Sequence, residues 1–115
     1  MNFEQLIPDL KAKRTDGAER VGFVLPNGEI VEVENICVEA NEGFEVSGAD
    51  LIKYQDAVAS WHTHPNAKST LSNNDWYGFR NYPQWTHLII GTDGVTSYKV
   101  GKGRVLVDKQ WIDEG

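Results

Sequence analysis

Cysteine is nearly absent from this sequence, which limits how the chain can be held together. Cys37 is the single cysteine among 115 residues, so no disulfide can form within the chain and no cluster of thiolates can hold a metal ion. This usage is compatible with a reducing compartment. Because Cys37 stands between Ile36 and Val38, we interpret it as a buried filler of a strand.

Basic residues and long apolar runs are also scarce. Lysine and arginine number 11 against 17 aspartates and glutamates, for a net charge of −6, which argues against a nucleic-acid partner. No apolar run approaches the roughly 20 residues of a membrane-spanning helix, so no membrane partner is expected. Residues 1–14 lack the basic head and apolar stretch of a secretory signal. The 40% of hydrophobic residues is enough for one folded domain over residues 1–115.

Apolar periodicity and turn signals predict an α/β order of elements. A helical stripe of apolar residues covers Asn2–Lys13. Ser47 and Ser72 each stand three residues before an aspartate, as in a capping box, and predict helices that end near Tyr54 and Arg80. Strands are predicted at Arg20–Leu25, Ile30–Ile36, Ala57–His62, Thr86–Gly91, Val95–Gly101 and Arg104–Val107. Of these six, the first and second should form one hairpin, and the fourth and fifth another.

A pair of histidines in Trp61-His62-Thr63-His64-Pro65 is the most informative chemical feature. Residues two apart in a strand project from the same face, so His62 and His64 should point together at the end of their strand. Pro65 lacks a backbone N–H and cannot continue a central strand, so the chain should turn there and leave the pair at the mouth of the sheet. The pair alone is weak evidence for a metal.

Asp75 adds an oxygen donor a short loop after this pair. Two imidazole nitrogens, one carboxylate oxygen and a fourth position for water make the pattern of catalytic rather than structural zinc. The same residue has an ordinary explanation, because Ser72-x-x-Asp75 is also a capping box for a helix over Asn73–Arg80. Both roles can hold together, since the helix entry lies close to the histidines.

The combined pattern resembles the JAMM signature of the MPN-plus zinc metallopeptidases. That signature is His-x-His-Pro followed after a loop by Ser-x-x-Asp, and it is complete in this chain. The family also has a glutamate upstream, in a Glu-x-x-Gly before an apolar strand, and Glu19-Arg20-Val21-Gly22 matches that element. The resemblance implies that a Zn²⁺ ion is held by His62, His64 and Asp75, with Glu19 as general base and Ser72 as donor to the oxyanion.

Other glutamates before the histidines are alternative bases. Glu29, Glu32 and Glu34 fall in or beside an alternating strand, where solvent-facing carboxylates are usual. Glu19 alone opens a nearly continuous apolar run, Val21–Leu25, of the kind found in buried strands. The further candidates are Glu39, Glu42 and Glu45.

The resemblance extends to the order of elements. It implies a single-domain JAMM-like sandwich, in which a mixed sheet is flanked by helices in the cytidine-deaminase-like layering. The short chain looks most like bacterial and phage members of the family, especially the domain of phage tail assembly proteins. The implied function is hydrolysis of an amide bond in a protein or peptide, by a zinc metallopeptidase or isopeptidase. The expected location is the cytoplasm of a bacterial or phage-infected cell, or the virion; nothing indicates the oligomeric state.

A second hypothesis is a non-catalytic module of the same fold, which binds zinc or a protein during assembly. Family members without activity generally lack metal ligands, so the retention of every candidate in this chain favours the enzyme. We interpret His87, within a predicted strand, as a hydrogen-bonded structural histidine rather than a ligand. The four tryptophans are interpreted as core or rim aromatics, and Trp76 has the alternative of lining a substrate groove.

Overall fold

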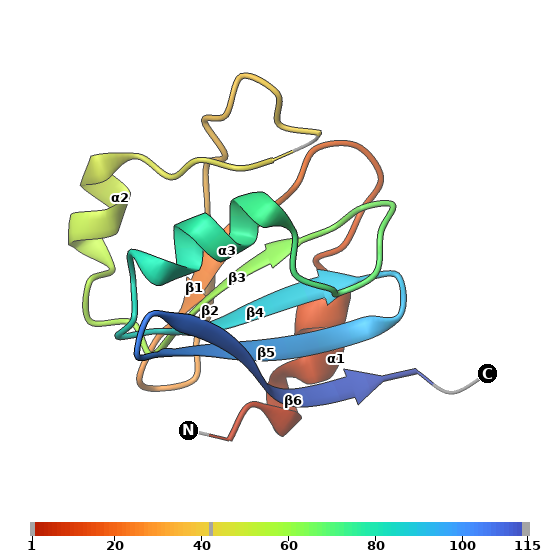
Figure 1. Ribbon diagram of the computed structural model, residues 1–115. Helices are drawn as coiled ribbons and strands as arrows, with labels where there is room; N and C mark the ends of the chain where they lie inside the picture. The colour runs from red at the N-terminus through yellow and green to blue at the C-terminus, as the bar shows by residue number, and fades with distance from the viewer. Residues whose placement is uncertain (1, 42, 114–115) are drawn as a thin grey trace.

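A six-stranded mixed sheet forms the centre of the molecule in a computed structural model, which describes residues 2–41 and 43–113 (Figure 1). The strand order is β2-β1-β3-β4-β5-β6, and every neighbouring pair is antiparallel except β3 and β4. The strands are β1 (Val21–Val24), β2 (Ile30–Val33), β3 (Ala59–Thr63), β4 (Thr86–Gly91), β5 (Gly94–Gly101) and β6 (Arg104–Ile112). The prediction of a single α/β domain with a mixed sheet is therefore confirmed.

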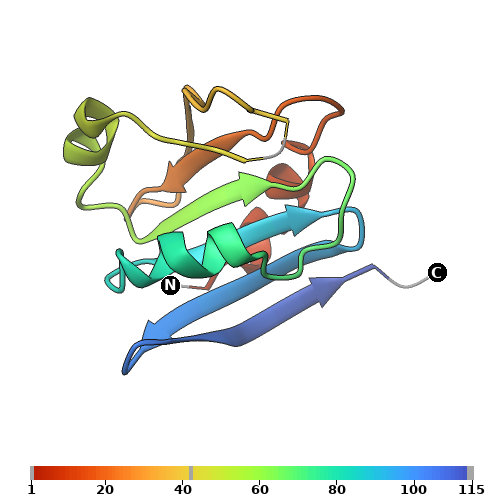
Figure 2. The same ribbon diagram turned by 45° about the horizontal axis from the view of Figure 1, so that its top comes forward.

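Helices lie on both faces of this sheet, as the turned view shows (Figure 2). A 3₁₀ turn, η1 (Glu4–Leu6), leads into α1 (Ile7–Lys11) behind the sheet, while α3 (Asn73–Arg80) crosses in front of it. The third helix, α2 (Gly48–Lys53), lies on the same side as α3, at the β1 and β2 end. None of the helices in the described ranges is long and apolar enough to cross a membrane.

The two faces of the sheet carry different chemistry because side chains alternate along each strand. The α1 face holds the main apolar cluster, which includes Leu10 of the helix and Trp61, Leu88 and Ile90 of the strands, all fully buried. The α3 face receives Val21 and Phe23 from β1 and His62 from β3, and His87 from β4 lies opposite Ser60. One face is thus almost wholly apolar, and the polar candidates gather on the other.

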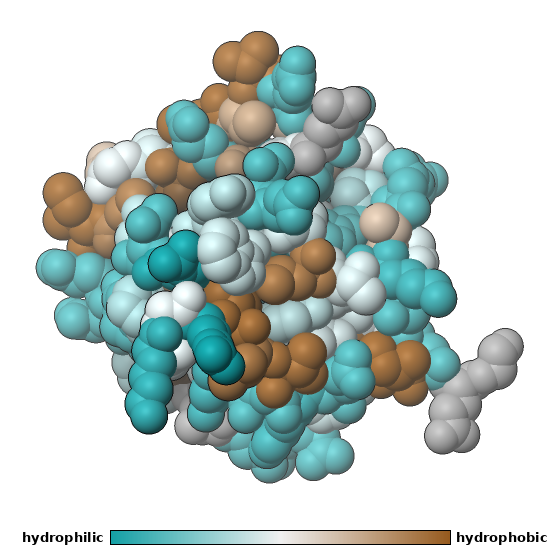
Figure 3. Space-filling view, viewed as in Figure 1, coloured by the Kyte–Doolittle hydropathy of each residue, from teal (hydrophilic) through white to brown (hydrophobic). Residues whose placement is uncertain are grey.

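The space-filling view adds that the α3 side is not uniformly polar (Figure 3). Apolar surface gathers beside α3 toward β5 and β6, where Leu71, Val100 and Val105 pack on a small cluster around Phe79. A second apolar spot lies on the segment between β2 and α2, where Val38 is fully exposed.

Three predicted element boundaries are wrong. The first helix is a 3₁₀ turn plus a five-residue α-helix rather than Asn2–Lys13, because Pro8, which lacks an N–H, suits only the first turn of a helix. The strand predicted to reach Ile36 ends at Val33. The last strand continues to Ile112 instead of Val107 because it pairs along β5, with a register shift at Ser97/Tyr98.

The early end of β2 also corrects the interpretation of Cys37. The side-chain oxygen of Asn35 accepts the backbone N–H groups of Cys37 and Glu45, at 3.0 and 3.1 Å. A side chain that takes up backbone donors in this way competes with strand pairing. Cys37 is consequently half-buried in an irregular segment and is not a strand filler.

Gly22 lies where two strands and a ring meet. A Cβ at this position would come 1.9 Å from the carbonyl oxygen of Val31 and 2.7 Å from the ring of Trp61. The Trp61 ring passes over the glycine, and its Nε1 donates to that same carbonyl at 3.2 Å. Only glycine fits between them.

We predict that Gly22→Ala lowers the free energy of unfolding by about 3 kcal/mol, because backbone and ring must both shift to admit the methyl group. Gly78 is a matched control, since a Cβ in its helical position would meet nothing within 4 Å. Gly78→Ala should raise the free energy of unfolding by about 0.5–1 kcal/mol through helix propensity. Urea unfolding of the three proteins measures both changes, and equal stabilities for wild type and Gly22→Ala would contradict the packing argument.

Candidate metal centre

The register between β1 and β3 brings Glu19 to the histidines. Val21 is paired with His62 in antiparallel register, and the N–H of Thr63 donates to the carbonyl of Arg20 at 2.9 Å. Continuing the register from Val21 and His62 by two residues on each strand places Glu19 opposite His64. Residues more than 40 positions apart in the sequence thus become cross-strand neighbours at the carboxyl end of β3.

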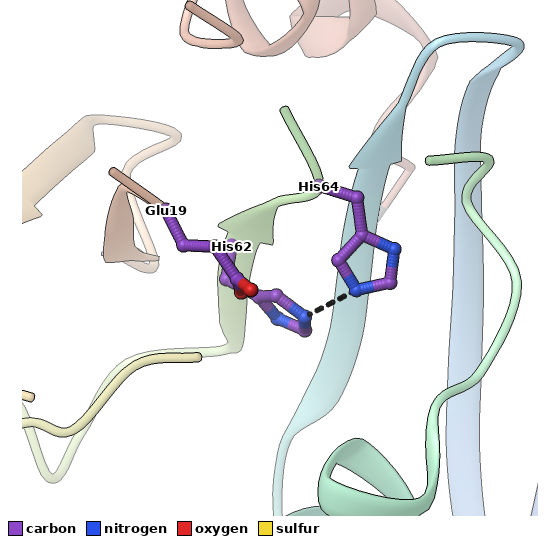
Figure 4. Close-up of side chains that lie close together, drawn as sticks. All are labelled: Glu19, His62 and His64. Atoms are coloured by element: carbon purple, nitrogen blue, oxygen red, sulfur yellow. Dashed lines mark hydrogen bonds between the residues drawn. The ribbon is translucent and has the colours of Figure 1, made fainter. Parts of the chain in front are cut away.

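A compact group of potential metal ligands results. One donor atom each from Glu19, His62 and His64 lies within 4.8 Å of the others, and all three residues are buried. Figure 4 shows the carboxylate of Glu19 beside the His62 ring, and the dashed line marks the 3.3 Å contact between the Nε2 atoms of His62 and His64. These residues could hold a metal ion.

Asp75 contacts both histidines from the other side. Its Oδ1 lies 2.9 Å from Nε2 of His62, and its Oδ2 lies 3.1 Å from Nε2 of His64. Asp75 also occupies the third position of α3, where its Oδ2 accepts the N–H of Ser72 at 3.2 Å and its own N–H donates to the Ser72 hydroxyl at 3.1 Å. The capping box predicted from the sequence is therefore confirmed, and the same carboxylate reaches the histidines.

The protonation of His64 fits a metal-binding role. Its Nδ1 lies 2.8 Å from the carbonyl oxygen of Lys68, which can only accept, so Nδ1 carries the proton. In the neutral ring, Nε2 then presents a lone pair toward Asp75 and His62. A backbone carbonyl that accepts the Nδ1 proton, and so fixes the tautomer, is typical of metal-ligating histidines.

The distances between the potential ligand atoms can be compared with those expected around a bound cation. Zinc ligands at about 2.0–2.2 Å in tetrahedral arrangement lie roughly 3.3–3.5 Å from one another. The contacts among His62, His64 and Asp75 are 2.9, 3.1 and 3.3 Å. At these separations either a proton on an imidazole nitrogen or a metal ion must lie between the lone pairs. The donor set, two imidazole nitrogens and carboxylate oxygens, is the one zinc accepts.

The electrostatics of the group follow from this crowding. Burial favours the neutral form of Asp75, yet the two imidazoles hold its pKa far below the usual range. Burial alone would lower the pKa of His64, but its hydrogen bonds to Asp75 and to the Lys68 carbonyl raise it overall. Burial raises the pKa of Glu19, partly offset by the nearby imidazoles. The three groups therefore form one coupled site with a strong attraction for positive charge.

A segment that the sequence did not implicate holds Glu19 in place. The Asn35 amide donates to the Glu19 carbonyl at 2.8 Å and to the Gly43 carbonyl at 3.1 Å. The Glu19 N–H donates to the Ala40 carbonyl at 2.7 Å. The same segment lays the ring of Phe44 on His62, with centroids 4.4 Å apart. An Asx-type signal at Asn35, two residues before Cys37, was the only local sign of this role.

The loop between the histidines and α3 is fixed by Ser69. Its N–H donates to Asp93 Oδ1 and its hydroxyl pairs with Thr96, both at 2.8 Å, while its carbonyl accepts the Tyr98 hydroxyl at 2.8 Å. These bonds tie the loop to the β4–β5 hairpin and so hold the Lys68 carbonyl against His64. Nothing in the local sequence pattern pointed to Ser69.

A cleft of about 330 Å³ opens from this group across the α3 face. At one end it is lined by Glu19, Ser72 and Asp75, which we call the metal end. The other end is apolar, and its walls come from β1, α2, α3 and the segment before α2. We call this the apolar end; its lining includes Phe23, Val46, Leu51, Tyr82 and Trp85.

The alternative bases are not placed like Glu19. Glu29, Glu32, Glu34 and Glu39 are exposed, as expected for solvent-facing carboxylates, and Glu32 is paired with Arg20. Glu45 is exposed although it lines the cleft, and Glu42 lies outside the described residues. Of the described glutamates, only Glu19 joins the histidines.

The roles predicted for His87 and for the tryptophans can be compared with the structure. His87 is buried, with Nε2 2.9 Å from the Tyr82 carbonyl and Nδ1 2.6 Å from the Ser60 hydroxyl, so the prediction of a hydrogen-bonded structural histidine is confirmed. Trp61 and Trp85 are core residues. Trp76 is partly buried under Arg80, whose guanidinium lies 4.4 Å from its ring centre, and it does not line the cleft.

Comparison with known proteins bears on the fold. No protein-family model and no curated protein matches the sequence. The structure is similar to the solution structure of a protein from Desulfitobacterium hafniense, with a TM-score of 0.64 and 15% identity over 97% of this chain and 91% of the other. At that identity the similarity extends to the fold alone.

We predict that His87 stays neutral until the pH is well below its ordinary range. Burial lowers the pKa of His87 from 6.5 to about 4. The unfolded chain takes up this proton first, so the stability contributed by neutral His87 is complete above about pH 6.5 and is lost as the pH falls toward 4. NMR titration of the ring C–H proton, assigned by its loss in His87→Gln, measures the midpoint, and a value near 6.5 would contradict the prediction.

Proposed function

We propose that this protein is a zinc-dependent metallopeptidase or isopeptidase of the JAMM type, which hydrolyses an amide bond in a protein or peptide. One observation carries the proposal. The residues of the complete His-x-His and Ser-x-x-Asp pattern converge with Glu19, and three members of this group, Glu19, Ser72 and Asp75, line an open cleft.

The ligand set we assign to zinc is His62, His64 and Asp75. Asp75 contacts both imidazole nitrogens, whereas Glu19 lies beside them without a similar pair of contacts. Three protein ligands leave one position for water or substrate, as in catalytic zinc sites. When bound, zinc would supply a Lewis acid and lower the pKa of a coordinated water toward about 7.

Glu19 is the proposed general base. Its carboxylate has an oxygen within 4.8 Å of a nitrogen of each histidine, and Glu19 lines the cleft. A water between the carboxylate and the histidines could therefore give its proton directly to Glu19. Glu19 would accept the proton of the attacking water and then return it to the nitrogen of the departing amine. The hydrogen bonds at its backbone N–H and carbonyl keep it at this position.

Ser72 is the proposed donor to the oxyanion. Its hydroxyl accepts the N–H of Asp75 at 3.1 Å, and a hydroxyl that accepts one bond can still donate its own proton. Ser72 lines the cleft next to Asp75, so this proton can point to an amide oxygen bound there. The helix cap fixes the position of the hydroxyl before a substrate binds, and an oxyanion donor is effective when it is positioned beforehand.

The family assignment carries further proposals. The layering of helices around the mixed sheet supports a JAMM-like, cytidine-deaminase-like sandwich. Among such domains we favour the bacterial and phage members, especially those of phage tail assembly proteins, because the sequence resembles these most. The corresponding place of action is the cytoplasm of a bacterial or phage-infected cell, or the virion.

We expect about one zinc per chain in protein purified without added metal, measured by elemental analysis. Asp75→Ala should lose most of this zinc because it removes the carboxylate that contacts both imidazoles. Glu19→Gln should retain zinc and lose peptidase activity, since an amide cannot take up the proton. Wild type without zinc even after reconstitution would sink the catalytic proposal.

We expect Ser72→Ala to reduce turnover about 10²–10³-fold while zinc stays bound, which is the usual effect of losing one oxyanion donor. The variant also loses a helix cap, which costs about 1 kcal/mol of stability. Ser47→Ala is the matched control, because Ser47 caps α2 in the same way, accepting the N–H of Asp50 at 3.1 Å, and does not line the cleft. Equal turnover in the two variants would remove Ser72 from the reaction.

A further inference from the structure

The last strand, β6, leaves a long edge of the sheet free. It is nine residues long and is hydrogen-bonded to β5 on one side only. In the turned view no other helix or strand of the described residues lies beyond it (Figure 2). The opposite edge strand, β2, has only four residues. A long edge strand offers its unpaired N–H and C=O groups to a strand of another chain, whereas a short one offers few.

Exposed apolar side chains are concentrated on the same strand. Leu106, Val107 and Ile112 are 56%, 57% and 43% exposed. They are three of the seven large hydrophobic residues that are exposed within residues 2–41 and 43–113. Apolar side chains gathered on a free strand edge are typical of a surface that another chain covers.

The first half of β6 is complementary to itself. Its sequence Arg104-Val105-Leu106-Val107-Asp108 has a valine on each side of the central leucine and opposite charges at the two ends. Antiparallel pairing of two copies about Leu106 sets each Arg104 opposite Asp108 of the other copy. It also sets each Val105 opposite Val107, and the two leucines opposite each other. Pairs of opposite charge and of β-branched residues stabilise neighbouring strands.

The side chains lie on the faces that this pairing requires. Residues of Arg104–Asp108 alternate between the two faces of the sheet. The valines lie on the α3 face, where Val105 packs on the small apolar cluster. The leucine and both charged residues lie on the α1 face, and Asp108 has its Oδ2 3.9 Å from Nζ of Lys99, the β5 partner of Leu106. Directly opposite residues share a face, so the two charged groups can meet across the junction.

Other registers fit less well. Centring the pair on Val107 sets Leu106 opposite Asp108 and Val105 opposite Lys109, which places charges against apolar side chains. Centring it on Asp108 or on Lys109 sets two like charges directly opposite each other, which is destabilising. The sequence of the strand therefore favours one register among these.

The second half of β6 is less available. A register centred on Trp111 would set Lys109 opposite Asp113 of the other copy. Asp113 is already paired with Lys11 through its side chain, and its N–H donates to the Asp93 carbonyl at 2.8 Å. The first half of the strand is thus the better site for a partner.

We propose that two copies of this chain associate edge to edge through β6, antiparallel and in register about Leu106, so that one sheet runs through both. Each copy contributes the same surface, as in a two-fold symmetric dimer. Main-chain groups pair across the junction, the leucines and valines are covered, and each Arg104 guanidinium meets Asp108 of the other copy. No residue of β6 lines the cleft, so the association does not depend on the function proposed above.

Sedimentation velocity of the chain over a wide range of concentrations, with and without zinc, tests this association. We expect a reversible dimer of the wild type in both conditions. Leu106→Lys should raise the dissociation constant about tenfold or more, because it sets two like charges directly opposite each other. Ile52→Lys is the matched control and should leave the dimer unchanged, since Ile52 is 71% exposed but lies on α2.

Charge reversal tests the register itself. Arg104→Asp and Asp108→Arg should each raise the dissociation constant about tenfold or more, because each sets like charges opposite each other at two places in the dimer. In an equimolar mixture of the two variants every such pair is again of opposite sign. The mixture should therefore dimerise as tightly as the wild type, and so should the protein that carries both substitutions.

Two results would overturn the proposal. A wild type that stays monomeric at millimolar concentration rules out a second copy as the partner and leaves this edge to a strand of another protein. A wild-type dimer that the charge reversals do not weaken, or that their mixture does not restore, is held together by another surface.

Discussion

The rest of this site depends on the contacts that the Asp75 carboxylate makes with the two histidines. One oxygen meets His62 and the other meets His64, at 2.9 and 3.1 Å, and the second also closes the cap of α3. The helix therefore cannot shift without moving the histidine contacts. The positive potential at a helix N-terminus supports a carboxylate at this position. Because α3 forms one wall of the cleft, the same contact also sets the cleft's opening.

Gathering two imidazoles and two carboxylates in a buried place costs free energy unless positive charge is shared among them. The opposite face of the sheet offsets this cost, because Trp61, Leu88 and Ile90 are fully buried there against α1. The sheet thus separates the two tasks. One face supplies the apolar burial that stabilises the fold. The other holds the imidazoles and carboxylates close together, where a cation would balance the negative charge.

The cleft is built from elements with different constraints. The metal end depends on the β1–β3 register and on α3, so few changes there preserve the group. The apolar end is lined by α2 and by the segment that Asn35 ties to Glu19. Its side chains can vary without moving the metal end, since they contribute no ligand. For the proposed peptidase, this division would let the substrate side chain vary while the ligand group stays the same.

The sequence by itself determined what depends on neighbours in the chain. The bounds of α3 and its Ser72 cap, the β4–β5 turn, and the pairing of His62 with His64 on one face all follow from spacings of a few residues. Local pattern failed where groups outside the predicted strand compete for its backbone: Asn35 takes up the N–H of Cys37 and leaves that residue half-buried beyond the end of β2, and pairing with β5 extends β6. Only the tertiary structure decided that Glu19 reaches the histidines, that Lys68 orients His64, and that a cleft continues to Trp85. Those contacts join residues far apart in the chain, and their geometry is set by strand register and packing, which short-range spacing does not encode.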